Sequence, residues 1–205
     1  SVDPDVDRLA LVCEDGTMFG EEYTLVACSD YVLQKFTSEN PGKTVHTVSN
    51  LSSTRALKDV TQRYNGSYTA AAVGEVNVVQ EMKRTKSIIG GEGNGGVILP
   101  SLHYGRDALI GIALFLSHLA EKKISVTALR NSYPVYYMSK NRVQLKEELP
   151  LESLFNKIRD AYPEATITDT DGLRLDFENE KKWVCLRKSN TEPIVRIYSE
   201  APDKT

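Results

Sequence analysis

The sequence contains 205 residues, of which 40% are hydrophobic and 26% are charged, and its formal net charge is −3. This is the composition of a globular protein that is long enough for one large domain or two small ones. The slightly acidic balance argues against nucleic acid or an anionic membrane surface as the main partner. Any anion-binding site must therefore be local.

The three cysteines lie far apart, form no C-x-x-C pair and are odd in number. Such thiols are typical of a reducing compartment, in which they stay free and buried. No signal peptide is visible, and the longest apolar run, residues 108–116, is too short to span a bilayer. These features predict a cytoplasmic protein with no membrane partner.

The first part of the chain, residues 1–39, contains an apolar run and an amphipathic helix. The run Leu9–Cys13 ends at the turn signal Glu14–Thr17, which predicts a buried strand with a hairpin-like return to Gly20. Apolar residues then recur at helical spacing and predict a helix over residues 22–35. Because the sequence opens without a methionine, directly before its most charged motif, we expect this part to be the tail of a domain that begins upstream.

Residues 40–124 alternate between strand and helix patterns. The patterns predict strands at 44–48, 67–73 and 87–90 and helices at 53–64, 76–84 and 107–121. A glycine-rich loop at 90–96 follows the last strand, and Asp107 can cap the last helix. This order predicts a layered α/β domain with a mixed sheet that binds ligands at the C-terminal ends of its strands. The three histidines show no carboxylate partner at useful spacing, and His118, on the apolar helix, is interpreted as structural.

Residues 125–205 predict a small α+β domain, an open-faced sheet with helix cover. An amphipathic helix is predicted from Leu151 to Tyr162. Asp171 and Gly172 form a tight-turn signal between two short strands. The strands are predicted at 133–145, 166–169, 173–177, 183–187 and 194–198.

The most charged motif is Asp3-Pro4-Asp5-Val6-Asp7-Arg8. Three like charges within five residues repel one another, so a fold that holds them together favours a cation between them. A hard divalent cation with oxygen ligands, magnesium or calcium, fits this set, since no histidine or cysteine joins it. The alternating carboxylates also match the start of an EF-hand loop. We reject that interpretation because Arg8 replaces the turn glycine and the apolar run Leu9–Cys13 follows.

The glycine-rich loop from Gly90 to Gly96 has neither the Walker A nor the G-x-G-x-x-G spacing. Its two functional side chains are Glu92 and Asn94, a carboxylate and an amide on a loop with few other side chains. Such groups are good partners for sugar hydroxyls, which both donate and accept hydrogen bonds. The alternative interpretation is a simple turn.

The third motif is the loop between the last two predicted strands, which two arginines bracket. Guanidinium groups, short hydroxyls and an amide around one loop suit a tetrahedral oxyanion such as phosphate. Pro193 restricts the loop, so less entropy is lost on binding. The alternative is a solvated hairpin tip. The candidate phosphate-binding residues are Arg187, Ser189, Asn190, Thr191 and Arg196.

In this order, the three motifs resemble those of the α-D-phosphohexomutase family, which comprises phosphoglucomutases, phosphomannomutases and phosphoglucosamine mutases. The resemblance covers the whole chain. It implies an isomerase that interconverts hexose 1-phosphate and hexose 6-phosphate through a phosphoserine and a bisphosphorylated intermediate. The phosphoserine segment of the family is absent from this sequence, so the resemblance implies that the missing N-terminal domains are partners and that this chain alone is inactive.

The resemblance also implies a role for each motif. Residues 1–39 would be the tail of a metal-binding second domain, 40–124 a sugar-binding third domain and 125–205 a phosphate-binding fourth domain. Asp3, Asp5 and Asp7 would bind Mg²⁺, and Arg8 would be catalytic by stabilising the transferred phosphoryl group. Glu92 and Asn94 would bind the sugar hydroxyls. The loop with Arg187, Ser189, Asn190, Thr191 and Arg196 would bind the phosphate that does not react.

The sequence departs from the family pattern at several positions. Pro4 replaces a glycine, Asn94 stands where serine is common, and Gly96 stands where many members carry a histidine. Ala72 occupies a place that is basic in some members. The general acid and base and the identity of the hexose phosphate therefore stay open. A non-catalytic calcium- or anion-binding module is the alternative function.

Overall fold

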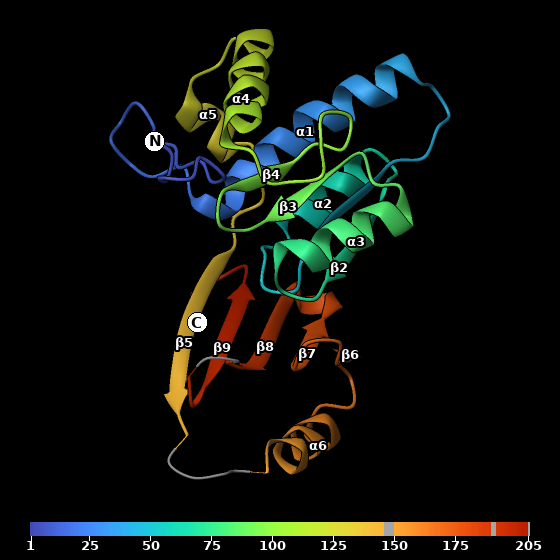
Figure 1. Ribbon diagram of the computed structural model, residues 1–205, viewed down its shortest axis with the longest axis vertical. Coiled ribbons are helices and arrows are strands. Elements are labelled where there is room, and N and C mark those ends of the chain that lie inside the picture. Colours follow the sequence, from blue (N-terminus) through green and yellow to red (C-terminus); the bar gives the residue numbers. More distant parts are fainter. Residues whose placement is uncertain (146–149, 190–191, 205) are drawn as a thin grey trace. The chain divides into compact units, whose positions relative to one another are not determined.

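The computed structural model describes residues 1–145, 150–189 and 192–204 (Figure 1). Contacts divide the chain into two compact units, Ser1–Val135 and Tyr136–Thr205. The first unit is one body that crosses the domain boundaries predicted at residues 39 and 124, and that finer division stays a prediction. Among the described residues, no helix combines the length and the apolar character that crossing a bilayer requires.

The first unit is built on a mixed four-stranded sheet. Its order is β2-β1-β3-β4, with β1 parallel to both of its neighbours and β4 antiparallel to β3. The sheet confirms the predicted fold class, and its parallel strands end at a common edge. The strands are β1 (His46–Asn50), β2 (Ser67–Ala71), β3 (Ile89–Glu92) and β4 (Gly96–Ile98).

Helices cover both faces of this sheet. Val48 of β1 packs with Val78 and Met82 of α3 on one face, whereas Thr47 hydrogen-bonds Thr61 of α2 on the other, as alternation along a strand requires. Helix α1 lies on the α2 face and also packs against α4 (Figure 1). The helices are α1 (Glu21–Glu39), α2 (Ala56–Arg63), α3 (Glu75–Thr85), α4 (Ala108–Lys122) and α5 (Val126–Asn131).

Helix α4 begins where the sequence predicts. The side chain of Asp107 accepts hydrogen bonds from the backbone N–H groups of Leu109 (2.8 Å) and Ile110 (3.1 Å), which are free donors in the first turn of a helix. The cap fixes the start of α4 and therefore also the position of the residue before it, Arg106.

Two sequence predictions for this unit are wrong. The run Leu9–Cys13 is not a strand, because its pairing is limited to isolated bridges, Val12 with Met18 and Val2 with Leu9. The predicted hairpin-like return is nevertheless present, since Cys13 N–H donates to Thr17 (2.8 Å) and Phe19 N–H donates to Leu11 (3.0 Å). The glycine-rich loop predicted at residues 90–96 is shorter, since β3 and β4 leave only residues 93–95 as its turn. Helix α5 was also not predicted.

The second unit is an antiparallel five-stranded sheet of order β5-β9-β8-β7-β6. Phe155 of α6 (Leu151–Ala161) packs on Leu173 and Leu175 of β7, which gives the predicted sheet with helix cover. A short 3₁₀ turn (Glu178–Glu180) precedes β8. The strands are β5 (Tyr137–Gln144), β6 (Thr166–Thr168), β7 (Leu173–Phe177), β8 (Lys182–Lys188) and β9 (Ile194–Ala201).

Candidate functional site

The acidic loop brings its three carboxylates together. Asp3, Asp5 and Asp7 can each offer one oxygen such that the three oxygens lie within 4.8 Å of one another. A turn closes the loop, in which Val6 N–H donates to the carbonyl of Asp3 (3.1 Å). Val6 has a φ of +57°, which is rare for a β-branched residue and strains the backbone. Strain of this kind persists where the surrounding contacts impose it, often at functional sites.

Arg8, the residue after Asp7, contacts two of these three carboxylates. Its Nε donates to Asp3 Oδ2 (2.6 Å) and lies 3.4 Å from Asp7 Oδ1. The backbone N–H groups of Asp7 and Arg8 donate to Asp3 Oδ1 at 3.2 and 3.0 Å. Desolvation alone would raise the pKa of Asp3, but the hydrogen bonds from Arg8 lower it well below its usual range. Asp3 is therefore a carboxylate at neutral pH.

Asp7 lies in a different electrostatic environment from Asp3. Desolvation raises the pKa of Asp7, and the guanidinium of Arg106 offsets only part of this effect. Its Oδ1 is buried and accepts no hydrogen bond from the described residues. Asp7 therefore pairs with Arg106 through one oxygen, while its other oxygen, 3.4 Å from Arg8 Nε, can still bind a cation at the loop.

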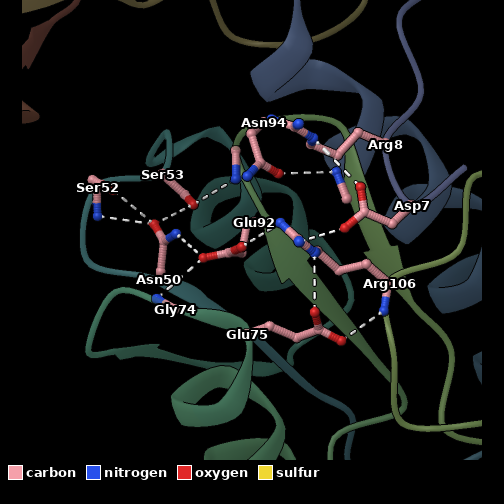
Figure 2. Close-up of polar contacts among 12 residues, drawn as sticks. Asp7, Arg8, Asn50, Ser52, Ser53, Gly74, Glu75, Glu92, Asn94 and Arg106 are labelled. Atoms are coloured by element: carbon pink, nitrogen blue, oxygen red, sulfur yellow. Dashed lines mark hydrogen bonds and ion pairs between the residues drawn. The ribbon is translucent and has the colours of Figure 1, made fainter. Parts of the chain in front are cut away.

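Glu92 lies at the end of β3 and is only 5% exposed. Its Oε1 accepts hydrogen bonds from Asn50 Nδ2 (2.8 Å), at the end of β1, and from Gly74 N–H (3.2 Å), at the start of α3. Its Oε2 accepts a hydrogen bond from Arg106 Nη1 at 2.8 Å (Figure 2). The buried carboxylate is satisfied at the edge where parallel strands end, the usual place for ligands in such sheets.

A serine loop after β1 holds the turn of the β3–β4 hairpin. Asn50 Oδ1 accepts hydrogen bonds from Ser52 N–H (3.0 Å), Ser52 Oγ (3.0 Å) and Ser53 Oγ (2.8 Å) (Figure 2). Ser53 Oγ in turn accepts from Gly93 N–H (2.9 Å). The side chain of Asn50 therefore positions both Glu92 and the turn that follows it.

Two glycines let the hairpin turn pack between neighbouring segments. A Cβ atom at Gly93 would collide with the carboxylate of Glu22, in the first turn of α1. Gly95 has a φ of +88°, and a Cβ atom there would collide with the carbonyl of Leu9. The hydrogen bond from Leu9 N–H to Gly95 places the hairpin directly beside the acidic loop.

Asn94 lies at the tip of this turn. Its Oδ1 accepts a hydrogen bond from Gly96 N–H at 3.2 Å, which stabilises the hairpin (Figure 2). The structure thus places both predicted sugar-binding residues, Glu92 and Asn94, on one short hairpin. Figure 2 shows them in one cluster of polar side chains with Asp7 and Arg8.

Arg106, which sequence analysis missed, joins these groups. Its guanidinium pairs with Asp7, lies 3.2 Å from Glu75 Oε2 and donates to Glu92 at 2.8 Å (Figure 2). Asn50 and Glu75 were missed as well. The rule that ligands bind at strand ends could have identified Asn50, but no local motif distinguishes Arg106.

The predicted phosphate loop lies in the second unit. Arg187 on β8 and Arg196 on β9 are direct cross-strand partners, so two guanidinium groups project from the same face of the sheet. Each pairs with a carboxylate, Arg187 Nε with Asp171 (2.8 Å) and Arg196 Nη2 with Glu192 (3.3 Å). Like charges directly opposite are destabilising, which favours an anion near them.

Ser189 follows β8 and is buried, and its backbone N–H donates to the carbonyl of Ile194 (2.9 Å). Asn190 and Thr191, the other two predicted phosphate-binding residues, lie outside the described residues. The structure therefore brings the metal and sugar candidates together in the first unit and locates Arg187, Ser189 and Arg196 in the second.

Residues 20–136 match the family description "Phosphoglucomutase/phosphomannomutase, alpha/beta/alpha domain III". The chain belongs to the phosphoglucomutase/phosphomannomutase family. Residues 142–205 match the C-terminal domain of the same family. The two matches together cover most of the chain, including the glycine-rich motif and the arginine-bracketed loop.

Relatives with assigned names cover nearly all of this chain. A phosphoglucosamine/phosphogalactosamine mutase of Sulfurisphaera tokodaii is 31% identical over 98% of this chain and 44% of its own length. A phosphoglucomutase/phosphomannomutase of Thermococcus kodakarensis is 29% identical over 97% of this chain and 42% of its own length. The chain therefore spans less than half the length of these relatives.

Solved structures share the fold. A phosphoglucomutase/phosphomannomutase family protein of Burkholderia thailandensis superposes with a TM-score of 0.78 at 24% identity, over all of this chain and 42% of its own. An N-acetylphosphoglucosamine mutase of Aspergillus fumigatus, solved with GlcNAc-6P and magnesium, gives a TM-score of 0.69 at 13% identity. It covers 99% of this chain and 48% of its own length.

Proposed function

We propose that this chain is the C-terminal part of a phosphohexomutase that interconverts the 1-phosphate and 6-phosphate of a hexose. The observation that carries the proposal is the junction in the first unit, where the acidic loop and the hairpin with Glu92 are hydrogen-bonded neighbours. A phosphoserine supplied by the rest of a longer protein would exchange its phosphoryl group with the sugar through a bisphosphorylated intermediate. The hexose belongs to the glucosamine, mannose and glucose group, which the names of the relatives span.

The acidic loop fits a magnesium ion. Its donor atoms are all carboxylate oxygens, the oxygens lie close enough together to share one ion, and Asp7 carries a buried oxygen without a hydrogen bond from the described residues. Asp3, Asp5 and Asp7 would hold the ion, which supplies charge neutralisation for a phosphoryl group in transfer. Arg8, half exposed beside the loop, would bind oxygens of the same phosphoryl group.

The remaining candidates would bind different groups of the substrate. Glu92 and Asn94 would bind hydroxyl groups of the sugar ring, a task that suits acceptors and amides held on a rigid hairpin. Arg187, Ser189 and Arg196 would bind the phosphate that is not reacting. Binding energy from that remote phosphate helps to position the reacting end of the molecule.

The proposal is tested by calorimetric titration of the 205-residue chain with glucose 6-phosphate, glucosamine 6-phosphate and mannose 6-phosphate, each with and without Mg²⁺. We expect weak binding that Arg196→Ala reduces by about tenfold, because a charge-assisted contact to phosphate is lost. Arg159→Ala, in helix α6, is the matched control and should bind like the parent chain. Tight binding of Ca²⁺ without any sugar phosphate binding would favour the calcium-module alternative.

A further inference from the structure

We propose that Arg106 is a positioning residue that couples the charge of Asp7, in the acidic loop, to the orientation of the Glu92 carboxylate. The inference rests on the proposed function and deepens it, because it implies that cation binding at Asp7 and sugar binding at Glu92 are energetically coupled. Neither the acidic motif nor the glycine-rich motif contains Arg106, which lies in the segment before α4.

Hydrogen bonds of its own backbone and of the next residue fix the position of Arg106. Its backbone N–H donates to Glu75 Oε1 (3.1 Å), and the next residue, Asp107, both donates its N–H to the carbonyl of Val97 (2.9 Å) and caps α4. The side chain of Arg106 is 19% exposed. A guanidinium held in this way has little freedom to leave its three carboxylates.

The charge at this junction is unbalanced. The guanidinium of Arg106 serves Asp7, Glu75 and Glu92 at once, and the guanidinium of Arg8, which binds Asp3, lies 3.4 Å from Asp7 Oδ1. The other donors to Glu92 are the neutral groups of Asn50 and Gly74. A change in the charge of Asp7 therefore changes how strongly Arg106 is attracted to the remaining carboxylates.

This competition gives the coupling its direction. When the Asp7 carboxylate binds a cation, it attracts Arg106 less. Arg106 then interacts more strongly with Glu92 and Glu75. The orientation of the Glu92 carboxylate is then fixed more firmly for a sugar hydroxyl. The planar guanidinium, with five N–H donors, can serve three acceptors at once, whereas a lysine ammonium is a point charge on a flexible stem.

A second route between the loops has to be separated from this one. The hydrogen bond from Leu9 to Gly95 connects their backbones without using the carboxylate of Glu92. The side-chain amide of Asn50, in contrast, donates directly to Glu92 and is the best reporter of the Arg106 route. Its two N–H signals are visible in a ¹⁵N NMR spectrum of the chain.

The test is a double-substitution cycle on the 205-residue chain. Asp7→Asn removes the charge of Asp7 without any metal, and we expect it to shift the side-chain amide signals of Asn50. In the Arg106→Met background the same substitution should move these signals by less than about a third as much, since the connecting group is gone. Arg84→Met, at an exposed arginine of α3 that pairs with Glu81, is the control and should leave the shift unchanged.

An equal shift of the Asn50 signals with and without Arg106 would overturn the inference. Arg106→Lys is a second variant in case Arg106→Met does not fold. It keeps the positive charge but loses the planar set of donors, so we expect a shift of intermediate size. A residue with a merely structural role would change the melting temperature but not the dependence of the Asn50 signals on Asp7.

A ligand arm tests the coupling with Mg²⁺ and glucose 6-phosphate. In the parent chain, saturating Mg²⁺ should strengthen binding of glucose 6-phosphate by about fivefold, and in Arg106→Met this ratio should fall towards one. If Mg²⁺ moves none of the amide signals of residues 3–8, the proposed metal site fails. The Asp7→Asn cycle still decides the role of Arg106 in that case, so the two failures are distinguishable.

Discussion

Glu92 and Asp30 are carboxylates of the first unit that are each 5% exposed, but they have different kinds of partner. Glu92 is paired with a cation, Arg106, which also serves two other carboxylates. Asp30, on α1, has no arginine or lysine among its hydrogen-bond partners in the described part of the chain. Its partners are Tyr64 Oη (2.6 Å), Tyr133 Oη (3.1 Å) and His118 Nε2 (3.3 Å).

The difference shows what each network does. Tyr64 directly follows α2, His118 lies in α4 and Tyr133 follows α5, so the hydrogen bonds of Asp30 connect α1 to these other helices. The hydrogen bonds of Glu92 instead come from Asn50, Gly74 and Arg106, and Arg106 also pairs with Asp7 of the acidic loop. Burial alone therefore does not mark a functional carboxylate, and the destination of its hydrogen bonds is more informative.

The largest effect is expected from Asp30→Ala, which should lower the free energy of unfolding by about 3 kcal/mol. It leaves two tyrosine hydroxyls and a fully buried histidine without their acceptor. Urea denaturation measures the loss, and Glu39→Ala, at an exposed position on the same helix, should change stability by less than about 0.5 kcal/mol. A loss below about 1 kcal/mol would show that these helices do not depend on the carboxylate.

Glu92→Gln should separate binding from stability. The substitution removes a charge-assisted hydrogen bond with Arg106, so we expect a loss of stability of about 1–2 kcal/mol together with about tenfold weaker binding of glucose 6-phosphate. Asp30→Asn is the matched amide substitution in the other network. It should reduce stability while leaving the affinity of the folded chain unchanged, as titration calorimetry can show. Equal effects of the two substitutions on affinity would remove the distinction drawn between the networks.

The pH dependence of stability should also differ between Asp30 and its amide variant. Desolvation alone would raise the pKa of Asp30, but hydrogen bonds from His118 and Tyr64 lower it below its usual range. A carboxyl group with a lowered pKa in the folded state contributes stability above its unfolded pKa of about 4, and this contribution is lost as the pH falls through the folded pKa. The stability difference between the parent chain and Asp30→Asn should therefore shrink between about pH 6 and about pH 3. Urea midpoints at the two pH values measure it, and a constant difference would contradict the lowered pKa.

The contrast between the networks also explains what the sequence could predict. The acidic loop is contiguous, so the spacing of Asp3, Asp5 and Asp7 was sufficient to predict that their carboxylates lie together. The cap at Asp107 was predictable for the same reason, since a cap acts on the turn that follows it. The mixed sheet followed from the alternation of strand and helix patterns.

The parts of the site that the sequence did not predict depend on residues that only the fold brings together. Asn50 and Arg106 reach Glu92 from the ends of separate elements, and no local pattern connects them. His118 was interpreted as structural without a carboxylate partner, yet it lies 3.3 Å from Asp30, far away in the sequence. His103 had a partner within reach of sequence analysis, because it hydrogen-bonds Asp107 four residues later (3.0 Å).

The smallest change in stability is expected for substitutions at two lysines, one after a helix of each network. We expect the two substitutions to have similar effects. Lys86 (φ +55°) directly follows α3, which begins with Glu75, and Lys123 (φ +52°) directly follows α4, which carries His118. Both residues are exposed and adopt the left-handed conformation, which is unfavourable for a side chain with a Cβ atom and suits glycine.

Lys86→Gly and Lys123→Gly should therefore each raise the free energy of unfolding by about 0.5–1 kcal/mol, the relief of strain being partly offset by the greater entropy of an unfolded glycine. Lys86→Ala and Lys123→Ala are the matched controls, because alanine also lacks the lysine charge but keeps the Cβ atom, and neither should stabilise the chain. Similar gains at the two helix ends would show that the helices carrying the networks are stabilised in the same way. The contrast between Glu92 and Asp30 would then arise from their side-chain partners and not from the backbone that carries them. A gain at only one of the two ends would instead mean that the surroundings of that helix contribute to the contrast.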